Sequence, residues 1–450
     1  MYTPHTAEEI RKMLDAIGVM SMEDLLLDVP PSVRLRRKLN TGQPQSELEI
    51  RQMFRQLTGR NCNLEEYVSF LGAGSYDHYL PALIGPILFR SEYYTAYTPY
   101  QAEISQGMLQ AIYEYQTAIC ELTGMEAANA SLYDGASALA EAVLMLARIG
   151  KGRSEIVIAR TIHPYYREVV RTYCQGLGLS LIEAGYVDGR VSPDEIRKSL
   201  TDNSAGLLLQ YPNFFGIIEE IPELIEMARK KGIRVAVSVD PVALGVLRSP
   251  AEFGADIVVG EGQGMGNAMS FGGPYVGFFA TRSEFIRQMP GRIVGVTHDR
   301  KGRKGYTLTL QTREQHIKRE RATSNICTNE SLNALASLFY MAALGKKGLA
   351  EVAAQSARKA HYLRTELGKL RNVSIPWTGS FFKEFTVRVS EAPESVNRRL
   401  IAEKIIGGLD LGKFYPELRG NMLFCVTEKR TRSEIDKLVS VISAGPNGKS

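Results

Sequence analysis

The sequence lacks the patterns that mark disulfide-bonded, metal-binding and membrane proteins. Its five cysteines form no CxxC pair, and an odd, widely spaced set is typical of reduced thiols in a cytosolic protein. The six histidines form no HExxH motif and no closely spaced pair, so no metal site is predicted. The most apolar stretch, 332–345, covers about 14 residues where a bilayer requires roughly 20. Because the start shows no targeting pattern, we expect a cytoplasmic protein without a membrane partner.

The chain also lacks a strong charge of either sign. It has 54 Lys and Arg against 49 Asp and Glu, and a net charge of +5 over 450 residues is too small to indicate nucleic acid. Hydrophobic residues make up 44% and charged residues 23%, which is the composition of a globular protein. At roughly 150 residues per domain, this length allows about three domains.

Hydrophobic patterning divides the chain into three predicted regions. Residues 1–60 are predicted to form a helical arm, because Thr6 and Glu9 give a capping box and apolar residues follow at helical spacing. Residues 61–326 are predicted to form a large α/β domain. Residues 327–450, with a long helical pattern followed by shorter strand-like runs, are predicted to form a smaller α+β domain.

The large domain shows an alternation of helices and strands. Helical patterns at 108–123 and 137–149 precede apolar, β-branched runs at 156–160, 179–184, 205–210, 234–240, 256–261 and 276–282. Such runs, separated by helical patterns, indicate a mostly parallel sheet covered on both faces. In such a sheet the functional loops are expected at the strand ends.

One candidate anion site lies before the first parallel strand. Gly135, Ala136 and Ser137 open a predicted helix, where free backbone amides and the helix dipole favour an anion such as a phosphate. Ordinary capping by Asp134 or Ser137 explains the same residues.

Asp240 ends the apolar run 234–240. A carboxylate at this position is costly unless it is paired, so a cationic partner is expected. In a pyridoxal-phosphate enzyme this partner is the protonated pyridine nitrogen, whereas a strand-end cap or a pair with an arginine explains Asp240 equally well. Such an enzyme also needs a Schiff-base lysine shortly after this aspartate, yet no lysine occurs between Lys231 and Lys301.

Two further stretches have an unusual composition. Residues 92–107, EYYTAYTPYQAEISQG, are too polar for a core and too aromatic for a solvated loop, so a binding or interface role and local turn packing explain them equally well. Residues 292–321 carry nine Lys or Arg against three acidic residues, a local charge of nine minus three, +6. This excess suits an anion or an acidic partner, with a solvated face as the alternative.

Four motifs together resemble a known family. YTPYQAEISQG (97–107), DGASALAEA (134–142), SFGGPYVGFFATR (270–282) and QTREQHIKRERATSNICTNESL (311–332) are similar to the N-terminal half of the glycine cleavage system P-protein, glycine dehydrogenase (decarboxylating). The stretch 16–30 is also similar, so the resemblance covers essentially the whole chain. Ala102, where proline is common, and Arg321, where lysine is common, depart from the family pattern.

The resemblance implies a fold-type-I, pyridoxal-phosphate-transferase-like fold and the role of subunit 1, the α subunit, in a two-chain enzyme. The family's Schiff-base lysine belongs to the second half, or subunit 2, and Gly264 lies near its expected position here. No catalytic residue is therefore expected on this chain, and pyridoxal phosphate is expected to be held covalently by the partner. The residues of a degenerate pocket on this chain would be Gly135, Ala136, Ser137 and Asp240.

The family reaction implies further partners. Glycine is decarboxylated on the partner's pyridoxal phosphate, and the aminomethyl group passes to the lipoyl arm of the H-protein. An α2β2 assembly with subunit 2 is expected. Side chains expected at the shared site, because hydroxyls and an amide can orient a small zwitterion, are Tyr97, Thr98, Tyr100 and Gln101. Basic residues expected to dock the H-protein or an anion are Arg300, Lys301, Arg303, Lys304 and Arg319.

Two alternatives stay open at this point. A stand-alone pyridoxal-phosphate transferase or decarboxylase needs a lysine near Asp240 and binds the coenzyme by itself. A non-catalytic scaffold or regulatory subunit carries a vestigial pocket, and variants of its loops change assembly but not turnover.

Overall fold

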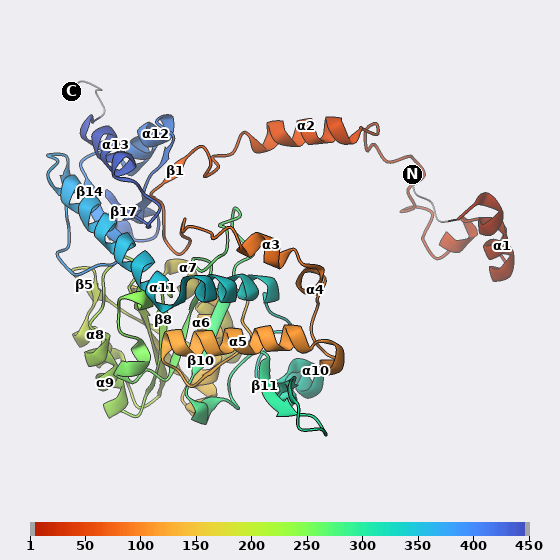
Figure 1. Cartoon of the computed structure of the whole chain (residues 1–450), viewed down its shortest axis with the longest axis horizontal. Helices are drawn as coiled ribbons and strands as arrows, with labels where there is room; N and C mark the ends of the chain where they lie inside the picture. Colours follow the sequence, from red (N-terminus) through yellow and green to blue (C-terminus); the bar gives the residue numbers. More distant parts are fainter. Residues whose placement is uncertain (1–4, 446–450) are drawn as a thin grey trace. The chain divides into compact units, whose positions relative to one another are not determined.

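The first part of the chain forms a small helical unit. The structure is a computed structural model that describes residues 5–445, and contacts within it separate Met1–Cys62 from Asn63–Ser450. The first unit contains α1 (Ala7–Ile17) and α2 (Glu47–Thr58) (Figure 1). Both helices begin with a capping box, from Thr6 with Glu9 and from Ser46 with Glu49, so the predicted helical character of the arm is confirmed.

The second unit is built on a seven-stranded sheet with the order β2-β10-β9-β8-β7-β3-β4. The five strands from β9 to β4 are parallel, and β10 is antiparallel to both of its neighbours, so the prediction of a mostly parallel sheet is confirmed. Each of the six apolar runs named from the sequence overlaps one strand, and the short strand β2 has no such run. The strands are β2 (Ala127–Ala128), β3 (Glu155–Ala159), β4 (Ser180–Ala184), β7 (Ser204–Tyr211), β8 (Arg234–Val239), β9 (Ile257–Glu261) and β10 (Gly277–Thr281).

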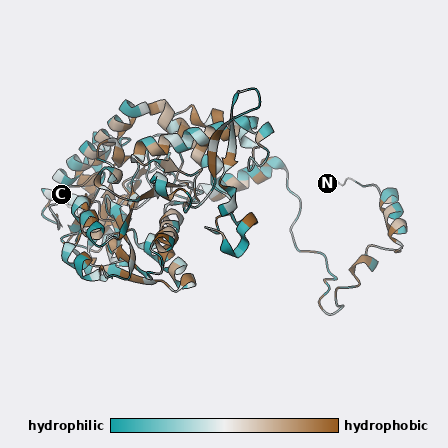
Figure 2. Cartoon of the chain, turned by 90° about the horizontal axis from the view of Figure 1, so that it is seen from below, coloured by the Kyte–Doolittle hydropathy of each residue, from teal (hydrophilic) through white to brown (hydrophobic). Residues whose placement is uncertain are grey.

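Helices cover this sheet and bury its apolar side chains. They are α5 (Gln106–Thr123), α6 (Gly135–Ile149), α7 (Pro164–Leu177), α8 (Pro193–Ser199), α9 (Ile221–Lys230) and the first part of α11 (Ser331–Gly368). Helices α5 and α11 lie side by side (Figure 1). The predicted core helix at 332–345 is confirmed as the start of α11, which kinks at Gly345. The helices show hydrophobic and hydrophilic sides in Figure 2.

The smaller domain has its own antiparallel sheet, in the order β13-β14-β17-β16. Its elements are β13 (Val373–Ser374), β14 (Glu384–Val389), α12 (Pro393–Ala402), β15 (Ile405–Ile406), β16 (Leu409–Asp410), β17 (Asn421–Cys425) and α13 (Arg432–Ser443). The strand β1 (Val68–Ser69) pairs in parallel with β15, and Phe70 joins this second core. Residues 68–70 therefore pack with the small domain, although the sequence places them at the start of the large one.

The remaining elements are short. The strands β11 (Ile293–His298) and β12 (Lys304–Thr309) form an antiparallel hairpin that extends from the large domain (Figure 1). The others are α3 (Ile84–Leu88), α4 (Ser91–Tyr94), β5 (Tyr186–Val187), β6 (Arg190–Val191) and α10 (Gln315–Lys318). Within residues 5–445, no helix is long and apolar enough to cross a membrane, and no cluster of three or more His, Cys, Asp or Glu could hold a metal ion.

Candidate functional site

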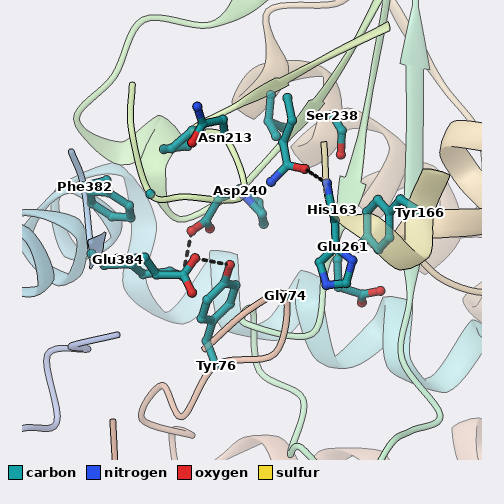
Figure 3. A pocket seen from close by; sticks show the side chains of 16 residues that line it. Gly74, Tyr76, His163, Tyr166, Asn213, Ser238, Asp240, Glu261, Phe382 and Glu384 are labelled. Carbon is teal, nitrogen blue, oxygen red and sulfur yellow. Dashed lines mark hydrogen bonds and ion pairs between the residues drawn. The ribbon is translucent and has the colours of Figure 1, made fainter. Parts of the chain in front are cut away.

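Polar side chains gather in a pocket where the parallel strands end. Asp240 follows β8, Glu261 ends β9, Gln210 lies near the end of β7, and His163 follows β3. The carboxyl ends of parallel strands meet at one edge of the sheet, so these side chains line one pocket (Figure 3). Residues 382–384 of the small domain and residues 74–76 close it from the other side.

Asp240 has the cationic partner that the sequence requires, and this partner is a lysine of the same chain. The ammonium nitrogen of Lys383 lies 2.7 Å from Oδ2 of Asp240, and the Lys383 side chain is only 1% exposed. The same nitrogen lies 3.4 Å from the centre of the Tyr76 ring, which adds a cation–π contact. The second oxygen of Asp240 accepts the backbone N–H of Val242, so Asp240 also acts as the strand-end cap.

A continuous line of buried contacts leads from this lysine through His78 to Glu428. Nζ of Lys383 lies 2.9 Å from Nε2 of His78, and Nδ1 of His78 lies 2.6 Å from Oε2 of Glu428. An ammonium can only donate, so Nε2 accepts and Nδ1 donates to Glu428. Burial, together with the charge of Lys383, lowers the pKa of His78, which favours this neutral ring. Against the opposing effect of its own burial, Glu428 has a pKa lowered to about 2, mainly by its hydrogen bond to His78.

The segment 72–79 is fixed across the pocket by the small domain. Glu384 accepts the backbone N–H of Ala73 at 2.6 Å and the hydroxyl of Tyr76 at 2.8 Å. Figure 3 shows Tyr76 and Glu384 pointing toward each other beside Asp240. Burial raises the pKa of Glu384 to about 7. The segment therefore bridges the two domains through side chains from both.

The predicted anion site at the start of α6 already has an acceptor. Gly135, Ala136 and Ser137 are buried, and the backbone N–H of Gly135 donates to Oε2 of Glu261 at 2.9 Å. The backbone N–H of Ser137 donates to Asp134 at 2.7 Å, which is the capping alternative named from the sequence. Oε1 of Glu261 accepts two further backbone N–H groups, from Gln263 and Val276. Burial raises the pKa of Glu261 to about 8.

The position expected for the Schiff-base lysine is a glycine crowded by the ring of His78. A Cβ atom on Gly264 would lie 3.1 Å from Cδ2 of His78, which is tighter than ordinary contact. Gln263 instead brackets the backbone of Tyr76, accepting its N–H at 2.8 Å and donating to its carbonyl at 3.1 Å. The backbone of Tyr76 and the ring of His78 therefore lie against Gln263 and Gly264.

His163 lies on the other wall of the pocket. Its ring stacks on Tyr166 with centres 4.8 Å apart (Figure 3), and its Nε2 lies 2.9 Å from the carbonyl oxygen of Ala73. Because Nδ1 accepts the backbone N–H of Tyr165, Nε2 is the donor to Ala73. Burial lowers the pKa of His163 to about 4, so the ring is neutral at physiological pH.

These residues do not fit pyridoxal phosphate. The remaining cavity measures about 40 Å³, whereas sites for molecules of this size measure roughly 300–1,000 Å³. Lys383 takes the carboxylate that a ring nitrogen would need, and Glu261 takes the Gly135 amide that a phosphate would need. The Lys383 amine, held as a donor to Asp240 and His78, is not available as a nucleophile.

The segment with the other predicted site residues lies away from this pocket and remains exposed. Tyr97 is 74% and Tyr100 is 62% exposed, Gln101 is exposed, and Thr98 is half-buried. The short 3₁₀ turn at Ala102–Ile104 links this segment to α5. The structure therefore separates the two predicted groups of site residues into a filled pocket and an exposed surface.

The basic stretch 292–321 divides in the same way. The predicted docking residues are all exposed. Four of them lie at the end of the β11–β12 hairpin, namely Arg300, Lys301, Arg303 and Lys304, and Arg319 lies beyond the hairpin. Arg292 and Arg313 are buried instead. Arg313 donates to the backbone carbonyls of Met289, Leu310 and Gly291, so its role here is to hold local backbone.

Sequence reasoning missed four residues that fill the pocket: His78, His163, Glu261 and Lys383. His163 and Glu261 follow apolar runs at the strand ends, so the pattern that selected Asp240 could have selected them too. Lys383 lies within the run SFFKEFTV, where a charged side chain among apolar ones signals a buried ion pair. The contact between His78 and Lys383 could not be predicted, because the two residues lie far apart in the sequence.

Comparison with known proteins gives a consistent result. A sequence model of the family "Glycine cleavage system P-protein" matches residues 1–442. The probable glycine dehydrogenase (decarboxylating) subunit 1 of Desulfitobacterium hafniense is 52% identical over 98% of both chains. That of Geobacillus kaustophilus is 50% identical over 99% of both chains.

Solved structures agree with the sequence matches. A crystal structure of glycine decarboxylase (P-protein) of the glycine cleavage system, in inhibitor-bound form, is similar with a TM-score of 0.90 and 40% identity, covering 98% of this chain and 99% of that one. A NifS-like protein, with a TM-score of 0.62 and 13% identity, covers 84% of this chain and 98% of its own, and shows the fold alone. The predicted fold class is confirmed.

Proposed function

This chain belongs to the glycine cleavage system P-protein family, and from this premise we propose that it is subunit 1 of a glycine dehydrogenase (decarboxylating) whose coenzyme is held by subunit 2. The enzyme decarboxylates glycine and passes the aminomethyl group to the lipoyl arm of the H-protein. Pyridoxal phosphate, when bound to subunit 2, supplies the electron sink for the carbon that loses CO₂. The filled pocket supports the assignment of the coenzyme to subunit 2. Lys383 already pairs with Asp240, and Gly264 stands at the position where a Schiff-base lysine would be needed.

The proposed contribution of this chain is to complete the partner's active site. We expect an α2β2 assembly in which Tyr97, Thr98, Tyr100 and Gln101 face subunit 2. The segment suits this role because its aromatic rings are exposed in this chain although large apolar surface favours burial in an interface. Hydroxyl and amide groups there would orient glycine or a coenzyme phosphate without acting as a base.

Reconstitution with subunit 2 tests this role. Tyr100→Phe and Gln101→Ala should each lower CO₂ release from glycine about tenfold, the effect of losing one transition-state hydrogen bond of roughly 1.4 kcal/mol. Tyr165→Phe, which removes the hydroxyl of an equally exposed tyrosine, is the matched control. Size-exclusion chromatography reports assembly. Unchanged turnover, or a loss of assembly alone, would favour the scaffold alternative.

The exposed hairpin β11–β12 is proposed to dock the H-protein. Arg300, Lys301 and Lys304 lie at its end, and the neighbouring Asp299 pairs with Arg303. Exposed charges attract over about 8 Å at 0.15 M salt and over about 3 Å at 1 M. High salt should therefore raise the apparent KM for the H-protein while the KM for glycine stays constant, and an H-protein KM that does not respond to salt would contradict the docking role.

A further inference from the structure

A buried arginine lies directly beneath the exposed tyrosine segment. Arg292, at the start of β11, is 7% exposed, and its guanidinium reaches two segments that are distant in sequence. Nη1 donates to the hydroxyl oxygen of Thr98 at 3.2 Å, and Nη2 donates to the carbonyl oxygen of Cys327 at 2.7 Å. Nη2 also lies 3.5 Å from the Tyr100 hydroxyl, and the guanidinium carbon lies 5.6 Å from the centre of the Tyr100 ring.

The position of Arg292 is fixed from below. Its backbone carbonyl accepts the N–H of Ala130 at 2.8 Å, which ties it to the chain beside the central sheet. Its Nε lies 3.7 Å from Oε2 of Glu314, whose side chain is 11% exposed, so a nearby carboxylate balances its charge. The planar guanidinium places Nη1 toward Thr98 and Nη2 toward Cys327 and Tyr100.

The segment above has little regular structure to hold it. Residues 96–100 belong to no helix or strand, and the bond from Tyr100 N–H to the Thr98 carbonyl is local. Ordering each backbone residue costs about 1–2 kcal/mol, so side-chain contacts must compensate for a fixed conformation here. Arg292 contacts both Thr98 and Tyr100, one on each side of Pro99.

We propose that Arg292 is a positioning residue that holds Thr98 and Tyr100 in the conformation in which they meet subunit 2. This inference rests on the proposed function for its catalytic consequence, but not for the contact itself. Arg292 touches neither substrate nor coenzyme and acts through the segment. It also joins two of the motifs that identify the family, 97–107 and 311–332, around one guanidinium.

Arg292→Lys separates positioning from a purely structural role. A lysine keeps the charge beside Glu314, so the thermal unfolding midpoint should stay close to that of the wild type. One ammonium cannot replace the planar fork that spans Thr98, Tyr100 and Cys327. If the contacts of Arg292 with residues 98–100 weaken by about 1.4 kcal/mol, the fraction of molecules in which this segment is detached should rise about tenfold. Arg292→Gln should loosen the segment and also lower the unfolding midpoint, because the largely buried Glu314 loses one of the charges that balance it.

Two measurements test the inference. In the isolated chain, chymotrypsin should cleave after Tyr97 and Tyr100 about tenfold faster in Arg292→Lys than in the wild type, with cleavage after exposed Phe54 as the internal reference and Arg248→Lys as the matched control. In the reconstituted complex, the same variant should lower kcat about tenfold with assembly intact. In a Tyr100→Phe background its effect should be smaller, because the two changes act through one contact.

The outcomes distinguish this inference from the proposed function. Wild-type cleavage rates in Arg292→Lys would overturn the inference, whatever the turnover. Faster cleavage of Arg292→Lys, together with wild-type turnover in both Arg292→Lys and Tyr100→Phe, would support the conclusion that Arg292 holds the segment. The same result would refute the catalytic role of the segment.

Discussion

The filled pocket and the tyrosine segment both carry polar side chains, but the pocket pairs them with one another and the segment exposes them. In the pocket, Asp240, Lys383, His78 and Glu428 form a continuous chain of contacts that are largely closed to solvent. In the segment, Tyr97 and Tyr100 expose most of their surface. The first region pairs its charges with one another, and the second leaves its hydroxyl-bearing rings exposed.

This difference shows how a fold of this type can be stable with its pocket filled by its own side chains. A bare Asp240 at the end of a buried strand would be costly, so loss of a pyridinium partner requires another cation. Lys383 supplies it from the small domain, and Glu261 satisfies the amide at the start of α6. The pocket thereby becomes a joint between two domains, because both walls contribute to the same contacts.

Breaking the pocket should have the largest effect on stability. Lys383→Met leaves the Asp240 carboxylate and Nε2 of His78 without their partner, and losing one member of a buried pair costs about 3–5 kcal/mol. We expect urea unfolding of the isolated chain to show this loss. The double variant Asp240→Asn/Lys383→Met removes both charges and should recover part of it.

Matched substitutions outside the pocket sharpen the comparison. Lys413→Met, at an exposed lysine, and Tyr100→Phe, at the exposed segment, should each change the free energy of unfolding by less than about 0.5 kcal/mol. An equal cost for Lys383→Met and Lys413→Met would mean that the buried pair does not hold the pocket.

The pH dependence of stability should show a smaller effect from the pocket. His163 has a pKa lowered to about 4 by burial, against 6.5 when unfolded, so the unfolded chain binds more protons between these values. The stability that neutral His163 provides is complete above pH 6.5 and is lost as the pH falls toward 4, by about 3 kcal/mol in full.

A variant separates the contribution of His163 to the pH dependence of stability from that of the other titrating groups. His163→Gln cannot take up the proton, so the free-energy difference between wild type and variant should shrink as the pH falls from 7.5 to 5, while groups common to both cancel. His316→Gln, at an exposed histidine, is the control and should run parallel to the wild type. A constant difference between wild type and His163→Gln would mean that His163 is not held neutral by burial.

Much of the fold follows from local pattern. The runs at 156–160, 205–210 and 234–240 are mainly apolar without strict alternation, and a strand buried on both faces leaves this signal in sequence. The capping box at Thr6 and Glu9 marks a helix start because its two hydrogen bonds lie within one turn. The strand β1 lacks such a signal, since two residues paired with β15 are too short to show a period.

The site was less accessible from sequence. The need for a cation near Asp240 follows from burial alone, and the missing lysine between 231 and 301 is visible directly. The identity of the cation is not, because Lys383 reaches Asp240 only after the small domain packs on the large one. The basic stretch misled in part, since Arg292 and Arg313 look like their neighbours in sequence and are buried instead.

The sequence by itself determined the elements, the parallel sheet and the lack of a coenzyme-binding lysine after Asp240, because propensity, periodicity and residue identity are local properties. Only the tertiary structure decided that the pocket is filled from within and that Arg292 lies under Thr98 and Tyr100. The physical reason is that buried charges choose partners by distance in space, and the packing of segments far apart in sequence, not their order along the chain, fixes that distance.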